Sequence, residues 1–127
     1  MNKVKDLKWE KKIKVDELVE NLGCVGFQAS EMKKAVDVIL KMKKSGAKVF
    51  LTYTSNMVTS GLRGFFAQLI ELGMVDVIVT TVGGIEEDIM KSLGEDFEVI
   101  NFNADDTALH ERGENRIGNL LIHTSSY

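Results

Sequence analysis

The sequence lacks proline altogether and contains one cysteine among its 127 residues. The single Cys24 cannot form a disulfide within the chain, which is typical of a protein in a reducing compartment. Long apolar runs are also missing, although a membrane-spanning helix needs about 20 apolar residues in succession. Residues 1–6 are too polar for the apolar region of a signal peptide. We therefore expect a cytoplasmic protein without membrane contact.

A strong charge of either sign is absent too, because 16 basic and 19 acidic residues give a net charge of −3. Nucleic-acid-binding domains usually carry a basic surface, so this balance argues against such a partner and leaves room for a cationic ligand. The shares of hydrophobic residues, 44%, and charged residues, 28%, are typical of a soluble globular protein. At this length we expect one ordinary domain at most.

The spacing of apolar residues alternates between the periods of helices and strands. A charged arm over residues 1–14 comes first, and we expect it to dock through Trp9. Asp16 is expected to cap the first helix, and Ser30 to cap the second, which Gly46 ends. The predicted helices cover residues 16–22, 30–45, 62–70 and 85–93, and the predicted strands cover 48–53, 74–80 and 97–102.

This alternation of strands and helices predicts an α/β fold with a three-stranded parallel sheet and right-handed crossovers. From residue 103 to 127 the periodicity is lost. Three parallel strands leave apolar edges exposed, and parallel sheets are normally covered on both faces. We therefore expect a fold that is incomplete without a partner chain. In the last segment only four residues look core-seeking, namely Ile117, Leu120, Leu121 and Ile122.

The turn after the first predicted strand, residues 52–61 (TYTSNMVTSG), is unusually polar. Ligands of open parallel sheets collect at the carboxyl ends of the strands, where helices begin. Hydroxyls and backbone N–H groups at such a point can bind phosphate oxygens with help from the helix dipole. The alternative is that Ser, Thr and Asn stand here only because they are preferred helix caps.

The turn after the second predicted strand, residues 80–88 (TTVGGIEED), combines two glycines with three carboxylates. The glycines allow a ligand to approach the backbone, and the carboxylates could bind a polyamine or a ribose hydroxyl. The alternative is that acidic residues in the first turn of a helix stabilise its dipole without any ligand.

Other candidate groups are weaker. His110 and His123 lie in an irregular region without the spacing of metal ligands, so we predict no metal site. Cys24 has no histidine near it and is expected to pack as a small hydrophobic residue. The lysines at the end of the second helix, Lys41, Lys43 and Lys44, are expected to form a solvated helix end rather than to supply a nucleophile.

Four segments, taken together and in order, closely resemble the amino-terminal part of deoxyhypusine synthases. They are residues 26–30 (GFQAS), 53–56 with 60–61 (YTSN, SG), 75–77 with 79–88 (VDV, VTTVGGIEED) and 115–121 (NRIGNLL). The resemblance implies that residues 15–127 are the first part of a Rossmann-like, NAD-binding domain. It implies a family that oxidises spermidine with NAD, carries the aminobutyl group on an active-site lysine and transfers it to a lysine of the hypusine-containing translation factor.

The same resemblance assigns roles to residues of the two polar turns. Glu86 and Glu87 would bind the amines of spermidine, and Glu87 would also reach the ribose of NAD. Family members commonly have Ala where this chain has Val82 and Ser where it has Thr59. The residues expected to line the NAD site are Ser55, Asn56, Met57, Val58, Thr59, Thr81, Val82, Gly83 and Glu87.

The family's nucleophilic lysine, its later glycine-rich NAD segment and its other spermidine ligands have no counterpart in this chain, so we expect no catalytic residue here. Our first hypothesis is a split enzyme, in which a second chain carries the carboxyl-terminal half and the two form a hetero-oligomer. The alternatives are a non-catalytic regulatory or scaffold subunit of a full-length synthase, a truncated chain, and part of a homospermidine synthase, whose acceptor is a free polyamine.

Overall fold

A computed structural model describes residues 3–127, so the first two residues of the predicted arm lie outside it. The chain divides into two compact units, Met1–Lys48 and Val49–Tyr127, and each is described here by itself. The second unit contains both polar turns.

The first unit consists of the charged arm and two helices, α1 (Val15–Leu22) and α2 (Gln28–Lys44). Between residue 3 and α1 the chain forms no helix or strand, and the Lys5 N–H donates to the Cys24 carbonyl over 3.0 Å. The Trp9 side chain is 77% exposed. Docking through Trp9 therefore stays a prediction.

Both helices of the first unit begin earlier than predicted. The N-cap of α1 is Lys14, whose N–H donates to the Glu17 carboxylate over 3.2 Å, so Asp16 is not the cap. Ser30 is not the cap of α2 either, because its hydroxyl donates to the Phe27 carbonyl over 2.9 Å instead of accepting from an N–H. At the other end of α2, Gly46 at a φ of +69° follows the helix, as predicted.

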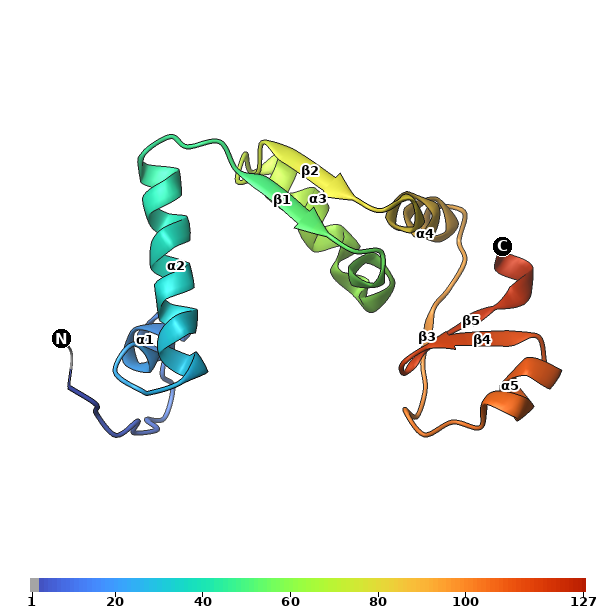
Figure 1. Ribbon diagram of the computed structural model, residues 1–127, viewed down its shortest axis with the longest axis horizontal. Helices are drawn as coiled ribbons and strands as arrows, with labels where there is room; N and C mark the ends of the chain where they lie inside the picture. Colours follow the sequence, from blue (N-terminus) through green and yellow to red (C-terminus); the bar gives the residue numbers. More distant parts are fainter. Residues whose placement is uncertain (1–2) are drawn as a thin grey trace. The chain divides into compact units, whose positions relative to one another are not determined.

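Helix α1 packs beside the N-terminal half of α2 (Figure 1). Lys33 links the two helices through an ion pair with Glu20 over 3.2 Å, and it also pairs with Asp37 within α2 over 2.6 Å. The apolar side chains Met32, Val38 and Ile39 of α2 remain about half exposed, at 54–55%.

The second unit begins with the β–α–β arrangement expected from the sequence. Strands β1 (Phe50–Tyr53) and β2 (Val77–Thr80) pair in parallel, with Phe50 opposite Val77 and Tyr53 opposite Thr80. Between them lie a π-helical turn, η1 (Val58–Leu62), and helix α3 (Arg63–Glu71), and α4 (Val82–Ser92) follows β2.

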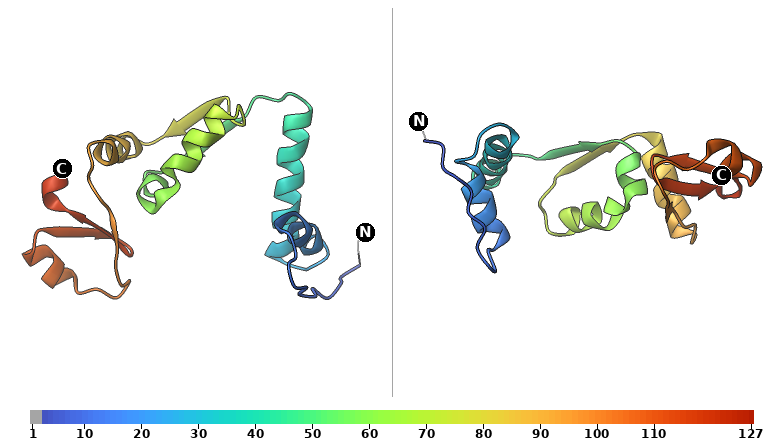
Figure 2. Two further views of the ribbon diagram at one scale, coloured as in Figure 1. Left: turned by 180° about the vertical axis from the view of Figure 1, so that it is seen from behind. Right: turned by 90° about the horizontal axis from the view of Figure 1, so that it is seen from below.

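Helix α3 covers one face of the β1–β2 pair (Figure 2). On that face the Tyr53 and Phe66 rings stack, with centroids 4.0 Å apart. Strand residues alternate between faces, so the opposite face presents Phe50 and Val79, which are 65% and 51% exposed. One face of this parallel pair is therefore apolar and uncovered.

The third strand does not extend the parallel sheet, and this prediction was wrong. Strand β3 is only Glu98–Val99, and it pairs antiparallel with β5 (Leu120–His123), which in turn pairs with β4 (Glu114–Ile117). Strand β3 pairs with the C-terminal β4–β5 hairpin instead of with β2. Leu121 and Ile122 of β5 are buried, with exposed fractions of 5% and 2%, which stabilises this hairpin. The short helix α5 (Asp106–Glu111) precedes that hairpin.

The buried apolar residues of the described chain are few compared with the apolar residues on its surface. Along α4 the exposed fractions of Val82, Ile85, Ile89 and Leu93 run from 54% to 83%. No described helix is long and apolar enough to cross a membrane. The buried apolar residues are Val58, Phe66, Met90, Leu109, Leu121 and Ile122.

Candidate functional site

The two polar turns lie at the same edge of the β1–β2 pair. Because the strands are parallel and Tyr53 stands opposite Thr80, their carboxyl ends lie side by side. The chain enters η1 after one strand and α4 after the other. The parallel pairing thus brings together two segments that are about 25 residues apart in the sequence.

The first turn coils directly into η1. The Ser55 carbonyl accepts from the N–H groups of Val58 and Thr59 over 2.8 and 3.2 Å. The Ser60 hydroxyl donates to the Met57 carbonyl over 2.9 Å. No side chain caps η1 or α3, both within the described residues. The hydroxyls therefore cap neither of these two elements, and their interpretation as caps of the helical stretch that starts at Asn56 stays a prediction.

The second turn is shorter than predicted, because α4 begins at Val82 and includes both glycines. A Cβ on Gly83 would lie 3.2 Å from the Ser55 Cβ, and one on Gly84 would lie 2.5 Å from the Thr80 hydroxyl oxygen. Glycine is unfavourable inside helices, and close packing explains its presence here. Gly83 brings the two turns into contact, and Gly84 lets α4 start directly against β2.

The three carboxylates after the glycines lie beyond the first turn of α4, which contains no acidic residue. Stabilisation of the helix dipole from the first turn therefore does not explain them. They face three different surroundings. Glu86 is exposed, Asp88 forms an ion pair with Arg63, and Glu87 is buried with 4% exposure.

Thr59 and Glu87 form the most deeply buried polar contact between the two turns. The Thr59 hydroxyl donates to Glu87 Oε2 over 2.5 Å, and Thr59 is only 3% exposed. A buried carboxylate is costly unless hydrogen bonds stabilise it, so this contact couples the position of η1 to that of α4.

Lys91 and Arg63 also connect the turns, although their residue types alone do not single them out in the sequence. The Lys91 ammonium donates to the carbonyls of Val58 and Thr59 over 2.9 and 3.1 Å. Arg63 Nη2 donates to the Ser92 hydroxyl over 2.5 Å, beside its ion pair with Asp88. The available signal was spacing, because Lys91 follows Glu87 by four residues and so shares its helix face.

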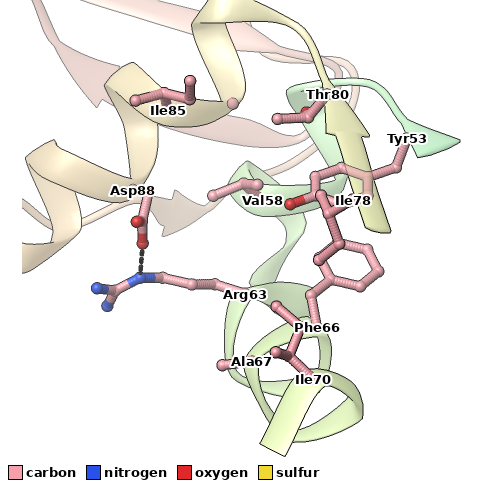
Figure 3. Close-up of a pocket in the computed structure, with 11 residues that line it drawn as sticks. Tyr53, Val58, Arg63, Phe66, Ala67, Ile70, Ile78, Thr80, Ile85 and Asp88 are labelled. Carbon is pink, nitrogen blue, oxygen red and sulfur yellow. Dashed lines mark hydrogen bonds and ion pairs between the residues drawn. The ribbon is translucent and has the colours of Figure 1, made fainter. Parts of the chain in front are cut away.

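Two hollows adjoin the turns. One, of about 410 Å³, lies between β1, η1, α3 and α4, where Figure 3 shows Arg63 reaching Asp88 and the Phe66 ring under Tyr53. The other, of about 340 Å³, lies at the carboxyl edge and is lined by residues 52–54 and 79–81. Both include Thr80, whose hydroxyl oxygen is buried and has no hydrogen-bond partner within the described chain.

These features fit the sugar and phosphate parts of a dinucleotide. The first turn of α4 offers N–H groups at the positive end of a helix dipole, no acidic side chain opposes an anion there, and the Thr80 hydroxyl lacks a partner. For a metal ion the described residues contain no group of three or more His, Cys, Asp or Glu side chains that could hold it.

The residues predicted to bind the cofactor and substrate differ in accessibility. Asn56, which accepts a hydrogen bond from the Thr54 hydroxyl, is open to a ligand, whereas Glu87 is engaged inside the unit. The exposed residues are Asn56, Thr81, Val82 and Glu86, those of intermediate exposure are Ser55, Met57 and Gly83, and the buried ones are Val58, Thr59 and Glu87.

Comparison with known proteins identifies relatives along nearly the whole chain. The family model for deoxyhypusine synthase matches residues 17–127. The chain is 44% identical over 126 residues to a protein of Schizosaccharomyces pombe named a probable deoxyhypusine synthase, covering 91% of this chain and 36% of that protein. A protein of the same name from Aeropyrum pernix is 39% identical, with 100% of this chain and 41% of the relative covered.

A solved structure supports the same relationship. A crystal structure assigned to a deoxyhypusine synthase of Entamoeba histolytica superposes with a TM-score of 0.54 and 35% sequence identity, covering 86% of this chain and 44% of that chain. The chain thus spans 36% and 41% of the length of these two relatives from Schizosaccharomyces pombe and Aeropyrum pernix.

Proposed function

Because the chain belongs to the deoxyhypusine synthase family, we propose that it supplies one part of the NAD and spermidine site of such a synthase. The reaction is the NAD-dependent transfer of the aminobutyl group of spermidine to a lysine of the hypusine-containing translation factor. The observation that carries the proposal is the meeting of the two polar turns at one sheet edge, in a chain matched by the family from residue 17 to 127.

Each turn has a role in this proposal. Bound NAD would supply the hydride acceptor for the oxidation of spermidine. The accessible residues of the first turn, Ser55 to Met57, and the start of α4, Thr81 to Gly83, would bind and orient it, while the buried Val58 and Thr59 support this surface from inside the unit. Glu86 is exposed and offers a carboxylate to a spermidine amine. Glu87 acts from inside the unit, where it holds Thr59 in place.

A second chain would supply the rest of the site, including the lysine nucleophile. The surfaces left uncovered in the second unit favour such a partner. The face of the β1–β2 pair with Phe50 and Val79 is apolar and open, and so is the outer surface of α4. With partner strands paired at an edge of the β1–β2 sheet and partner helices on its open face, these strands would become part of a larger Rossmann-like sheet in a hetero-oligomer.

Co-expression with a chain carrying the carboxyl-terminal half of a synthase tests the proposal. We expect the two chains to copurify, to bind NAD and to form deoxyhypusine from spermidine and the translation factor. Omitting the translation factor and adding a free polyamine checks for homospermidine formation instead. A copurified complex that binds NAD no better than the partner alone would refute the role of the two turns.

Substitution of an exposed site residue separates catalysis from scaffolding. Asn56→Ala should leave assembly intact and weaken NAD binding and turnover, because Asn56 is exposed within the first turn. Asn103→Ala is the matched control, an exposed asparagine outside both turns. Full activity of the Asn56→Ala complex would instead favour a regulatory or scaffold subunit. Glu87 suits this test poorly, since it is buried and its loss disturbs the fold.

A further inference from the structure

Lys91 stands at the junction of three segments of the second unit. It projects from the last turn of α4, its ammonium donates to the Val58 and Thr59 carbonyls of η1 over 2.9 and 3.1 Å, and it lies 5.0 Å from the centre of the Phe97 ring. An ammonium group has three donors and no acceptor. Two of them are committed to successive backbone carbonyls, and the aromatic face covers the charge.

The turn to which Lys91 donates its hydrogen bonds, η1, is irregular. Gly61 has a φ of +98° within η1, so the regular helical hydrogen-bond pattern is interrupted between η1 and α3. Carbonyls at such an interruption need other donors. Lys91 provides them from a different helix, so the shape of η1 depends on a side chain that is about 30 residues away in the sequence.

Glu87 and Lys91 act on the same residue from the same helix face. They are four residues apart on α4, one helical turn. Glu87 accepts from the Thr59 hydroxyl, and Lys91 donates to the Thr59 carbonyl, so the side chain and the backbone of Thr59 are held from opposite ends. The two contacts fix the first polar turn to the helix that begins at the second.

We infer that Lys91 is a positioning residue for the cofactor site: it sets the spacing between the turn at Ser55 to Thr59 and the start of α4. This inference rests on the proposed function, which assigns both segments to NAD. Lys91 does so through backbone carbonyls, without touching the cofactor. Arginine can preserve this grip, since it keeps the charge and the donors, whereas methionine keeps the stem and loses both.

The test compares Lys91→Met and Lys91→Arg in the complex of this chain with its partner. For Lys91→Met we expect NAD to bind about tenfold to a hundredfold more weakly, the range that loss of charge-assisted hydrogen bonds implies. The KM for NAD should rise in parallel, while kcat at saturating NAD changes by less than about twofold. Lys91→Arg should restore most of the affinity. Lys34→Met is the matched control, because Lys34 is an exposed lysine that pairs with Glu31 on α2.

A second readout is independent of activity. Hydrogen exchange of residues 55–62 should accelerate in Lys91→Met and not in Lys34→Met. If Lys91→Met does not assemble, Phe97→Leu replaces it; this variant keeps the lysine, removes the covering ring and should weaken NAD binding several-fold. An assembled Lys91→Met, or Phe97→Leu in its place, that binds NAD like the wild type overturns the inference alone. A wild-type complex that binds no NAD overturns the proposed function and this inference together.

Discussion

Replacing Thr59 by valine removes one hydroxyl and keeps the shape of the side chain. The hydroxyl donates to the buried Glu87 carboxylate over 2.5 Å, and both residues are less than 5% exposed. Hydrogen bonds to charged groups contribute about 1.5–3 kcal/mol, and a buried carboxylate that loses its donor has no water to replace it. We therefore expect Thr59→Val to destabilise the contact between η1 and α4 by about 2 kcal/mol.

Hydrogen exchange measures this loss where it occurs. A destabilisation of about 2 kcal/mol corresponds to roughly 30-fold faster exchange of amides that open with the contact. The effect should appear in residues 55–62 and 82–92 and should leave α1 and α2 unchanged, since these helices belong to the first unit. Wild type and variants are to be compared in the same state of assembly.

Two further variants separate the hydrogen bond from packing. Thr59→Ser keeps the hydroxyl and loses only the methyl group, so its amides should exchange more slowly than those of Thr59→Val. In the double variant Thr59→Val with Glu87→Met, no buried charge is left without a donor, and the combined effect should be smaller than the sum of the single effects. If Thr59→Val exchanged no faster than Thr59→Ser, the hydrogen bond would not couple the turns.

Two other predictions concern packing and pH. Gly84→Ala should destabilise the second unit by roughly 1–2 kcal/mol, because overpacking outweighs the gain from removing a helix glycine. The new Cβ would lie 2.5 Å from the Thr80 hydroxyl oxygen. Adding Thr80→Ala should therefore restore the lost stability, as measured by thermal denaturation. Hydrogen bonding from the Arg116 guanidinium holds the pKa of Asp106 below its usual 3.8, so the stability this pair contributes is present above that pH and lost as the pH falls through the lowered pKa. Relative to the intrinsic exchange rate at each pH, hydrogen exchange of α5 and the β4–β5 hairpin should accelerate on acidification below about pH 4, and Asp106→Asn should remove that part of the acid response. An unchanged acid response in Asp106→Asn would contradict the assignment to this pair.

The sequence determined the local elements and the family. Apolar spacing located α3, β1 and β2 close to their observed bounds, because a helix stripe or a buried strand leaves its period in a few neighbouring residues. Ordered segments such as GFQAS and VTTVGGIEED identified the family, which the match over residues 17–127 confirms. Boundaries were less certain, as Ser30 shows, because a hydroxyl can donate as well as accept.

The tertiary structure decided how those elements pair and what the polar residues contact. The segment containing β3 has the sequence pattern of a parallel strand. It nevertheless pairs with β5 of the β4–β5 hairpin, because β5 supplies the backbone hydrogen-bonding groups for this two-residue strand. Glu87 looked like a free carboxylate and is buried against Thr59, and Lys91 carried no signal by residue type although it grips η1. Such contacts join residues about 30 positions apart, and periodicity within one element contains no information about them.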